Sequence, residues 1–275
     1  MDFLAAILLG VVEGLTEFLP VSSTGHLTIT EKLLGLRIDD PAVTAFTAII
    51  QVGAIAAVVV YFRTDLWRIT KAWLLGLRRA QHRGSADYRL GWYIVIGSMP
   101  IGIVGFLGKD LVTGALRSLW WVAAGLIGWS AVMVLAERRG TQQRDETQIT
   151  LRDVVVIGVV QCIALVPGVS RSGATISAGL LRGLDRVTAT RMSFFLSIPA
   201  LVAAGLYEIK DAIAGDISLM STVVATVVSF VVAYAAIAWL LRFVAHHSIE
   251  VFVLYRVALG LLLVGLLATG TISAT

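Results

Sequence analysis

Long apolar runs recur along this chain and are separated by short polar and basic segments. A helix that crosses a bilayer needs about 17–25 predominantly apolar residues. Six runs reach or approach that length, and each predicts a transmembrane helix: 42–62, 90–107, 118–137, 192–207, 218–241 and 250–272.

Two further apolar stretches, 3–31 and 152–183, are interrupted by Gly, Pro and polar residues. Each predicts two half-helices joined by a loop, which is typical of segments that enter and leave a membrane by the same face. We therefore expect an all-α polytopic membrane protein with about six transmembrane helices and two re-entrant helix-loop-helix segments. The expected domain is single and covers residues 1–275.

Composition supports a membrane protein over a soluble one. Of 275 residues, 57% are hydrophobic and 15% charged, and a soluble core of this size cannot bury so much apolar surface. The only cysteine, Cys162, excludes an internal disulfide and a cysteine zinc site. A net charge of +4 needs no nucleic-acid partner, because cytoplasmic loops of membrane proteins are rich in Lys and Arg.

The basic residues divide unevenly between the segments that join the spans. Most lie in 63–89, 138–152, 182–191 and at Arg242, which predicts that these segments are cytoplasmic. This uneven division appears only if each interrupted stretch begins and ends on the same face of the membrane. The opposite face receives fewer basic residues: Lys32, Arg37, Lys109, Arg117 and Lys210.

The interrupted stretches resemble each other. "GVVEGLTEFLPVSSTGH" begins at Gly10 and "GVVQCIALVPGVSRSGA" begins at Gly158, and they align without a gap. Three spans separate the copies, so the second is inverted, and the halves 1–137 and 152–275 form an inverted-topology repeat whose loops meet near the midplane. The alternative is two kinked hairpins of unrelated origin.

The first copy carries two carboxylates. Glu13 and Glu17 are four residues apart and share one helix face. Two carboxylates in a low dielectric repel unless a cation bridges them or one holds a proton, and Mg²⁺ or Ca²⁺ prefers such oxygen ligands. The alternative is a helix that faces water at the membrane surface.

Hydroxyls and a histidine follow in "PVSSTGH". Pro20 ends the first half-helix, and the start of the next offers free N–H groups to an anion such as phosphate. His26 lies in the first turn of that helix and is a catalytic candidate, although a lone membrane histidine often only packs. The hydroxyl candidates are Ser22, Ser23 and Thr24.

The second loop, "PGVSRSGAT", supplies a cation instead of acids. The planar guanidinium of Arg171 fits a phosphate, but it could equally neutralise Glu13 or Glu17. Ser170, Ser172 and Thr175 could cap the following helix and donate to phosphate oxygens. Together, the two loops suit phosphoryl transfer, and the lack of a Walker motif argues against nucleotide hydrolysis.

The two motifs and their separation resemble those of the undecaprenyl-diphosphate phosphatase family, also called BacA or UppP. The likeness extends over nearly the whole chain. The residues that match the family pattern are Glu13, Glu17, Ser22, Ser23, His26, Ser170, Arg171 and Thr175.

The resemblance implies hydrolysis of undecaprenyl diphosphate to the monophosphate carrier of peptidoglycan synthesis, and an association with bacitracin resistance. It implies an inner-membrane enzyme with a site facing the periplasm and a divalent cation on Glu13 and Glu17. Arg171 then binds the diphosphate, and Ser23 or His26 is the nucleophile or the general acid/base. Gln51 is expected near the site.

A transporter or flippase of prenyl phosphate lipids is the rival interpretation, because inverted repeats with broken helices are common in transporters. Such a protein would use Arg171 and the helix starts but would not need His26 beside Ser23. The sequence leaves the oligomeric state open.

Overall fold

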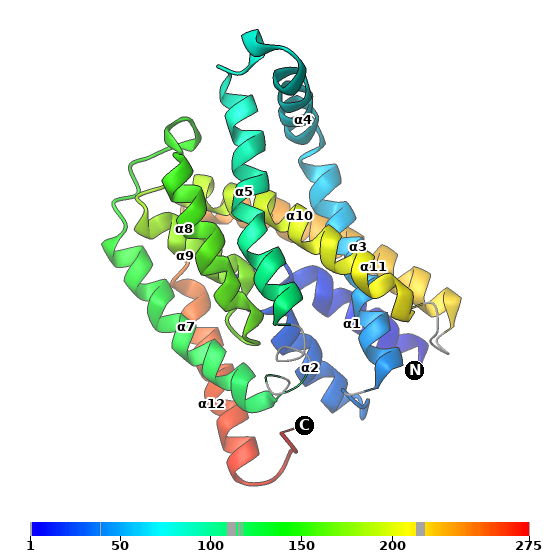
Figure 1. The fold of residues 1–275 in the computed structure, drawn as a ribbon. Coiled ribbons are helices and arrows are strands. Elements are labelled where there is room, and N and C mark those ends of the chain that lie inside the picture. The colour runs from blue at the N-terminus through cyan, green and yellow to red at the C-terminus, as the bar shows by residue number, and fades with distance from the viewer. Residues whose placement is uncertain are drawn as a thin grey trace.

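Long helices dominate the architecture (Figure 1). The computed structural model describes residues 2–38, 40–108, 114, 116, 118–212 and 218–274, and these contain no β-strand. Six of the described helices are long and apolar enough to cross a membrane. They coincide with the six predicted runs, which confirms the all-α polytopic class: α3 (Pro41–Tyr61), α5 (Ala86–Leu107), α7 (Leu119–Arg139), α10 (Arg186–Ala212), α11 (Leu219–Val244) and α12 (Val251–Ala268).

The outer surface of these helices is apolar. Val223, Val227 and Val231 are four residues apart on α11 and are 51%, 55% and 58% exposed. A contiguous apolar surface of this kind is unfavourable in water and favourable in lipid. The exposed faces are therefore those expected of a protein surrounded by hydrocarbon.

Each interrupted stretch forms two short helices. The first gives α1 (Phe3–Thr16) and α2 (Ser23–Leu33), and the second gives α8 (Leu151–Gln161), the 3₁₀ turn η3 (Cys162–Leu165) and α9 (Arg171–Leu181). The two copies share an uncommon local structure. Ser22 and Ser170 have φ of 79° and 76°, and each hydroxyl accepts a hydrogen bond from the backbone N–H three residues later.

Ion pairs and hydrogen bonds show where these segments end. Asp153, near the start of α8, pairs with Arg182, just after α9, so this stretch begins and ends at one end of the molecule. Arg138 pairs with Glu250 before α12, and the opposite end of α12 leads to Ser273, which accepts a hydrogen bond from Lys32 of α2. The C-termini of the half-helices α2 and α9 thus lie at opposite ends of the molecule. Re-entrance into a membrane and the inverted repeat stay predictions.

The segments predicted to be cytoplasmic lie together. Arg191 pairs with Glu146 and with Asp65, which links 182–191, 138–152 and 63–89. The segment 63–89, for which no secondary structure was predicted, contains α4 (Arg63–Arg78) and the 3₁₀ turn η1 (Ala80–His82). A further 3₁₀ turn, η2 (Glu146–Gln148), lies in 138–152. Of the opposite group of basic residues, Lys109 and Arg117 lie outside the described residues.

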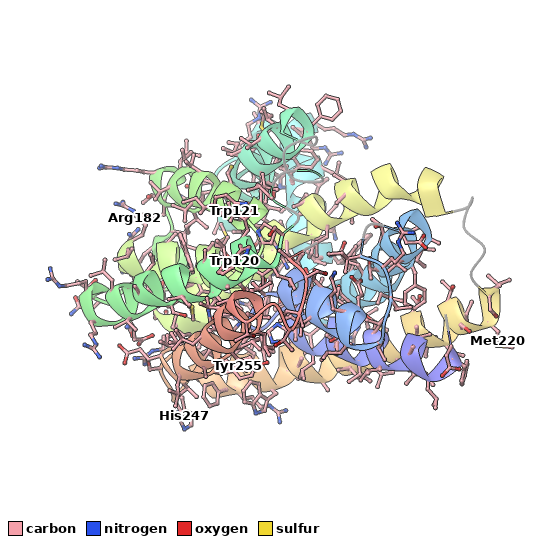
Figure 2. The ribbon with its side chains drawn as sticks, turned by 90° about the horizontal axis from the view of Figure 1, so that it is seen from below. Trp120, Trp121, Arg182, Met220, His247 and Tyr255 are labelled. Atoms are coloured by element: carbon pink, nitrogen blue, oxygen red, sulfur yellow. The ribbon has the colours of Figure 1, made fainter. Side chains whose placement is uncertain are left out.

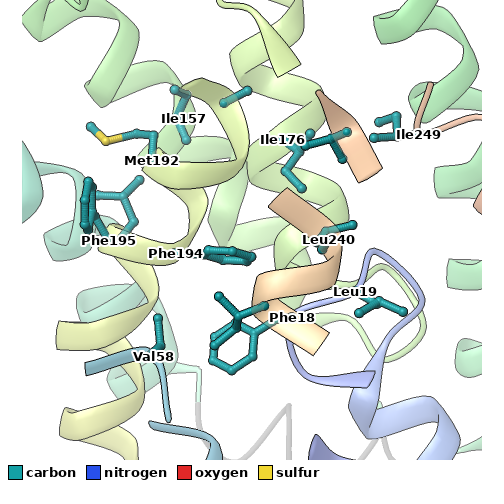
Figure 3. Close-up of a cluster of buried hydrophobic side chains, with 14 of the residues drawn as sticks. Phe18, Leu19, Val58, Ile157, Ile176, Met192, Phe194, Phe195, Leu240 and Ile249 are labelled. Carbon is teal, nitrogen blue, oxygen red and sulfur yellow. The ribbon is translucent and has the colours of Figure 1, made fainter. Parts of the chain in front are cut away.

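Small residues and a buried aromatic cluster hold the short helices at the centre. A side chain at Gly10 would meet the carbonyl of Ala225 at 2.5 Å, so α1 packs directly on the backbone of α11. Gly158 of α8 approaches the carbonyl of Gly97 on α5 in the same way. The loop after α1 inserts Phe18 into the core, where its ring packs edge-on against that of Phe194, with ring centroids 5.2 Å apart (Figure 3).

Candidate functional site

The two loops predicted to meet do so. Ser172 at the start of α9 donates a hydrogen bond to the carbonyl of Leu19 in the first loop, at 2.8 Å. Both residues are buried, so this bond fixes one loop against the other where water does not compete. The polar run in the first copy and the loop of the second copy therefore form one candidate site.

Arg256 of α12 ties both loops to the helices around them. Its side chain is fully buried, and its guanidinium donates to carbonyls from the first loop (Pro20, 2.9 Å) and the second loop (Gly168 and Val169, each 3.0 Å). It also donates to Gly125 O and Ser130 Oγ of α7. All these partners are neutral. The positive charge of Arg256 therefore stays uncompensated beside the two loops and favours an anion there.

The second loop lies unusually close to α7. Gly168 has φ of +92°, and a side chain there would come within 2.2 Å of the carbonyl of Val122. Glycine is required for both reasons, the backbone conformation and the space. This contact brings Arg171, three residues later, to its place opposite the first loop.

Glu17 forms the centre of the charged cluster. One oxygen, Oε1, accepts from Arg171 Nη2 at 3.0 Å, and the other, Oε2, accepts from Ser23 Oγ at 2.5 Å. The side chains of Glu17 and Arg171 are 4% and 11% exposed. A hydroxyl, a carboxylate and a guanidinium from three short helical segments are thereby connected in one chain. The pairing of Arg171 with Glu17, one of the two roles expected for this arginine, is present.

Polar groups near this cluster remain without partners. Glu13 is 1% exposed and lies within electrostatic range of Glu17 and Arg171. Glu13 Oε1 and Arg171 Nη1 are buried and have no hydrogen-bond partner among the described residues. Such groups are costly unless a ligand or water satisfies them, so the centre of the molecule is prepared to receive polar atoms.

His26 points to a different partner. Its Nδ1 lies 2.7 Å from the carbonyl of Ser22, and its Nε2 lies 2.5 Å from the hydroxyl of Tyr255 on α12. Ser23 and His26 are three residues apart on α2 and share a face, but the hydroxyl of Ser23 bonds to Glu17. The carboxylate, and not the imidazole, is therefore the base in contact with the candidate nucleophile.

The other predicted residues lie outside the charged cluster. Ser22 and Ser170 cap α2 and α9, as expected of hydroxyls there. Thr175 is fully buried, and its hydroxyl lies within hydrogen-bond distance of Arg171 O (2.9 Å) and Ser193 Oγ (2.7 Å), so it connects the second loop to α10. Thr24 is exposed. Gln51 is half-buried on α3, which packs against α1, and its part in the site stays a prediction.

The sequence analysis did not assign two residues of this region. Tyr255 and Arg256 both lie inside the predicted span 250–272, and neither received a role there. Their adjacency in "LYRV" within a predicted span was the available signal, because ionisable groups inside a membrane are rarely without function. Their partners lie more than 80 residues away along the chain, and spacing alone could not identify them.

Comparisons with known proteins agree on one family. The family described as bacitracin resistance protein BacA matches residues 6–262. A protein of Frankia casuarinae named undecaprenyl-diphosphatase 3 is 59% identical over 278 residues and is covered completely, as is this chain. The undecaprenyl-diphosphatases of Acidothermus cellulolyticus and Mycolicibacterium smegmatis are 57% and 50% identical, again over the full length of both chains.

Proposed function

Because the chain belongs to the bacitracin resistance protein family BacA, we propose that it is an undecaprenyl-diphosphatase. It hydrolyses the phosphoanhydride bond of undecaprenyl diphosphate and releases undecaprenyl phosphate and inorganic phosphate. The observation that carries the proposal is the connected set of Ser23, Glu17 and Arg171 at the junction of the two loops.

Ser23 is the nucleophile in this proposal. Its hydroxyl already donates to Glu17 Oε2, which is the geometry of a nucleophile with its general base. As Ser23 Oγ forms a bond to the terminal phosphorus, its proton passes to Glu17 and the bond to the bridging oxygen breaks. The leaving group is undecaprenyl phosphate, and the terminal phosphoryl group stays on Ser23.

Arg171 holds the phosphate groups. In the structure its Nη2 bonds to Glu17, while Nη1 is buried and has no partner in the described part of the chain. Phosphate oxygens can satisfy this donor, and the starts of α2 and α9 add backbone N–H groups and a favourable dipole. Arg256 contributes a further positive charge that no carboxylate among its contacts neutralises.

His26 serves the second half of the reaction. Water attacks the phosphoryl group on Ser23, the bond from Ser23 Oγ to phosphorus breaks, and Glu17 returns its proton to that oxygen. The attacking water must lose a proton, and His26, one turn from Ser23 on α2, is the neutral base on the same helix face.

A divalent cation fits beside this cluster. Glu13 Oε1 is free to bind one, and each Glu17 oxygen keeps a second lone pair. The described residues form no group of three His, Cys, Asp or Glu side chains around a metal position, so protein ligands would be two carboxylates. That number suits Mg²⁺, which commonly binds one or two carboxylates together with substrate phosphates, better than Ca²⁺. When bound, the cation would neutralise phosphate charge.

The proposed location is the bacterial inner membrane, with the site open to the periplasm. The concentration of Arg and Lys at the end that holds α4 supports a cytoplasmic position for that end. The hydrolysed lipid then becomes available again as a carrier for peptidoglycan synthesis. A transporter needs no hydroxyl bonded to a carboxylate, so the contact between Ser23 and Glu17 favours the enzyme.

The test is phosphate release from undecaprenyl diphosphate by the purified protein in detergent, with Mg²⁺ and with excess chelator. We expect release that requires the cation, and a loss of at least about 100-fold in Arg171→Ala, since one electrostatic donor contributes that much. Arg242→Ala, at an exposed position in the last turn of α11, is the matched control and should match wild type. No release by a well-folded wild type would contradict the proposal.

A further inference from the structure

α12 places a phenol against the one histidine of the site. Tyr255 lies 229 residues after His26, yet its hydroxyl is 2.5 Å from His26 Nε2. The two rings also stack, with centroids 5.5 Å apart and planes 18° from parallel. Tyr255 lies on the surface of α12 in the view of Figure 2 and is 49% exposed, so its hydroxyl joins His26 to the outside of the fold.

The hydrogen-bond partners of His26 determine which nitrogen carries its hydrogen. The carbonyl of Ser22 can only accept, so Nδ1 must donate to it. In the neutral imidazole, Nε2 then has the lone pair, and the hydroxyl of Tyr255 donates to it. Both ring nitrogens are occupied, and His26 is held in one orientation and one tautomer.

Because the Tyr255 hydroxyl occupies Nε2, a proton reaches or leaves this nitrogen through that hydroxyl. A hydroxyl donates to a neutral imidazole and accepts from an imidazolium, so the same two atoms stay bonded before and after His26 is protonated. Hydrolysis of a diphosphate consumes one water, and one proton leaves the site whenever inorganic phosphate is released as the dianion.

We propose that Tyr255 is a positioning residue that orients His26 and passes protons to and from it. The water that attacks the phosphoryl group gives one proton to the Tyr255 oxygen while the hydroxyl proton of Tyr255 moves to His26 Nε2. One O–H bond of water and the original O–H bond of Tyr255 break, while a new O–H bond on Tyr255, an N–H bond on His26 and the bond from the water oxygen to phosphorus form. The reverse transfer returns the proton from His26 to a water at the Tyr255 oxygen. The inference rests on the proposed diphosphatase function.

The rigidity of α12 supports this role. The next residue, Arg256, is fully buried and donates to carbonyls of both loops and of α7. Tyr255 is therefore fixed relative to the loop that carries His26, because the helix that holds it is bonded to that loop at Pro20. A mobile phenol could not maintain the contact with His26 through successive turnovers.

The first test compares Tyr255→Phe with Tyr234→Phe in the purified full-length protein. The substitution at 255 keeps the ring and its stacking and removes only the hydroxyl. Tyr234 on α11 is 37% exposed, and its hydroxyl has no hydrogen bond among the described residues, so it is a matched control. We expect kcat to fall by about 10–100-fold in Tyr255→Phe, because a positioned proton-transfer group contributes a factor of this order or more. KM should stay within about twofold of the wild-type value. Tyr234→Phe should equal wild type.

The second test does not depend on activity. The ¹⁵N spectrum of protein labelled at histidine reports the tautomer of each imidazole, and the signals lost in His26→Gln identify those of His26. We expect hydrogen on Nδ1 in both proteins, because Ser22 O accepts from it, and a shifted Nε2 signal in Tyr255→Phe, where this nitrogen loses the hydrogen bond from the phenol. A wild type that hydrolyses substrate, with equal kcat and equal His26 signals in Tyr255→Phe, would overturn the inference and leave the proposed function intact. A reduced kcat with unchanged His26 signals would also overturn it, because Tyr255 would then not act through His26.

Discussion

Arg256 shows how a single residue can join the parts of this site. A fully buried guanidinium is costly unless its donors are satisfied, and here a hydroxyl and four carbonyls, from α7 and both loops, satisfy them. The carbonyls of Pro20, Gly168 and Val169 belong to irregular backbone that cannot form helix hydrogen bonds. Arg256 therefore solves the hydrogen-bonding problem of the loops and adds positive charge for a phosphate substrate.

Replacing Arg256 by Met should destabilise the protein as well as inactivate it. Methionine fills similar space but leaves several buried carbonyls unpaired, and we expect a loss of about 3 kcal/mol or more in the free energy of unfolding. Denaturant unfolding in detergent micelles measures this loss. Arg242→Met removes an exposed arginine in the last turn of α11 and should change stability little. Equal unfolding curves for Arg256→Met and wild type would show that the loops do not depend on this side chain.

The chemistry of single residues was only partly readable from the sequence. Glu17, Ser23 and Arg171 could be identified because acids, hydroxyls and an arginine are out of place in apolar segments. Spacing within "EFLPVSS" could not show that Ser23 bonds to Glu17, because that contact depends on how the chain turns at Pro20 to Ser22. Tyr255 could not be assigned, because its partner is on a helix at the other end of the chain.

At the scale of elements, short helices are held by their ends. The start of α8 is fixed by Asp153, whose side chain is fully buried and receives hydrogen bonds from Arg144, Arg182 and Thr150. Burial disfavours the charged carboxylate, but the hydrogen bonds from Arg144 and Thr150 outweigh it and hold the pKa of Asp153 well below its ordinary value. This network joins the beginning of α8 to the end of α9.

The low pKa of Asp153 predicts a loss of stability in acid. The pKa of Asp153 is about 3.9 in the unfolded chain and lower in the folded protein. The ionised carboxylate therefore contributes its full share of the folding stability above about pH 3.9, and this share declines as the pH falls below that value. We expect unfolding between about pH 5 and pH 3 to become easier in wild type and to change less in Asp153→Asn. Asp2→Asn, at the exposed N-terminus, is the control. The same pH dependence in wild type and Asp153→Asn would contradict this role.

The positions of the helices were predictable, whereas some of their details were not. Six apolar runs gave six spans, because length and hydropathy are sufficient for that inference. The helix α4 was not anticipated within a basic segment, although Leu66, Ile69 and Trp73 recur at helical spacing there. The breaks after α1 and α8 could be recognised from Pro and Ser, since both interrupt the helical pattern.

At the scale of the whole molecule, the two predicted halves exchange elements. α1 of the first half packs against α11 of the second, and α8 of the second packs against α5 of the first. α3 also packs against α10, and α7 against α12. Neither half can therefore bury its short helices alone, and the charged cluster forms only when both are present. This exchange is what an inverted repeat would produce.

The orientation can be tested with single cysteines in a Cys162→Ser background. Gly84 lies in the segment between α4 and α5, and a side chain there meets nothing within 4 Å, while Leu34 follows α2 near the opposite end (Figure 1). We expect a membrane-impermeant thiol reagent added outside intact cells to label Leu34→Cys and not Gly84→Cys. Labelling of Gly84→Cys alone would reverse the proposed orientation.

The most direct test of the central claim is phosphate release from undecaprenyl diphosphate by Ser23→Ala, compared with wild type and Thr28→Ala. Thr28 is on the same helix, and its hydroxyl bonds only to the carbonyl of Thr24 among the described residues. We predict that Ser23→Ala remains folded and releases no phosphate above background, while Thr28→Ala matches wild type. Turnover by Ser23→Ala close to that of wild type would contradict the assignment of the nucleophile and of the site built around Glu17 and Arg171.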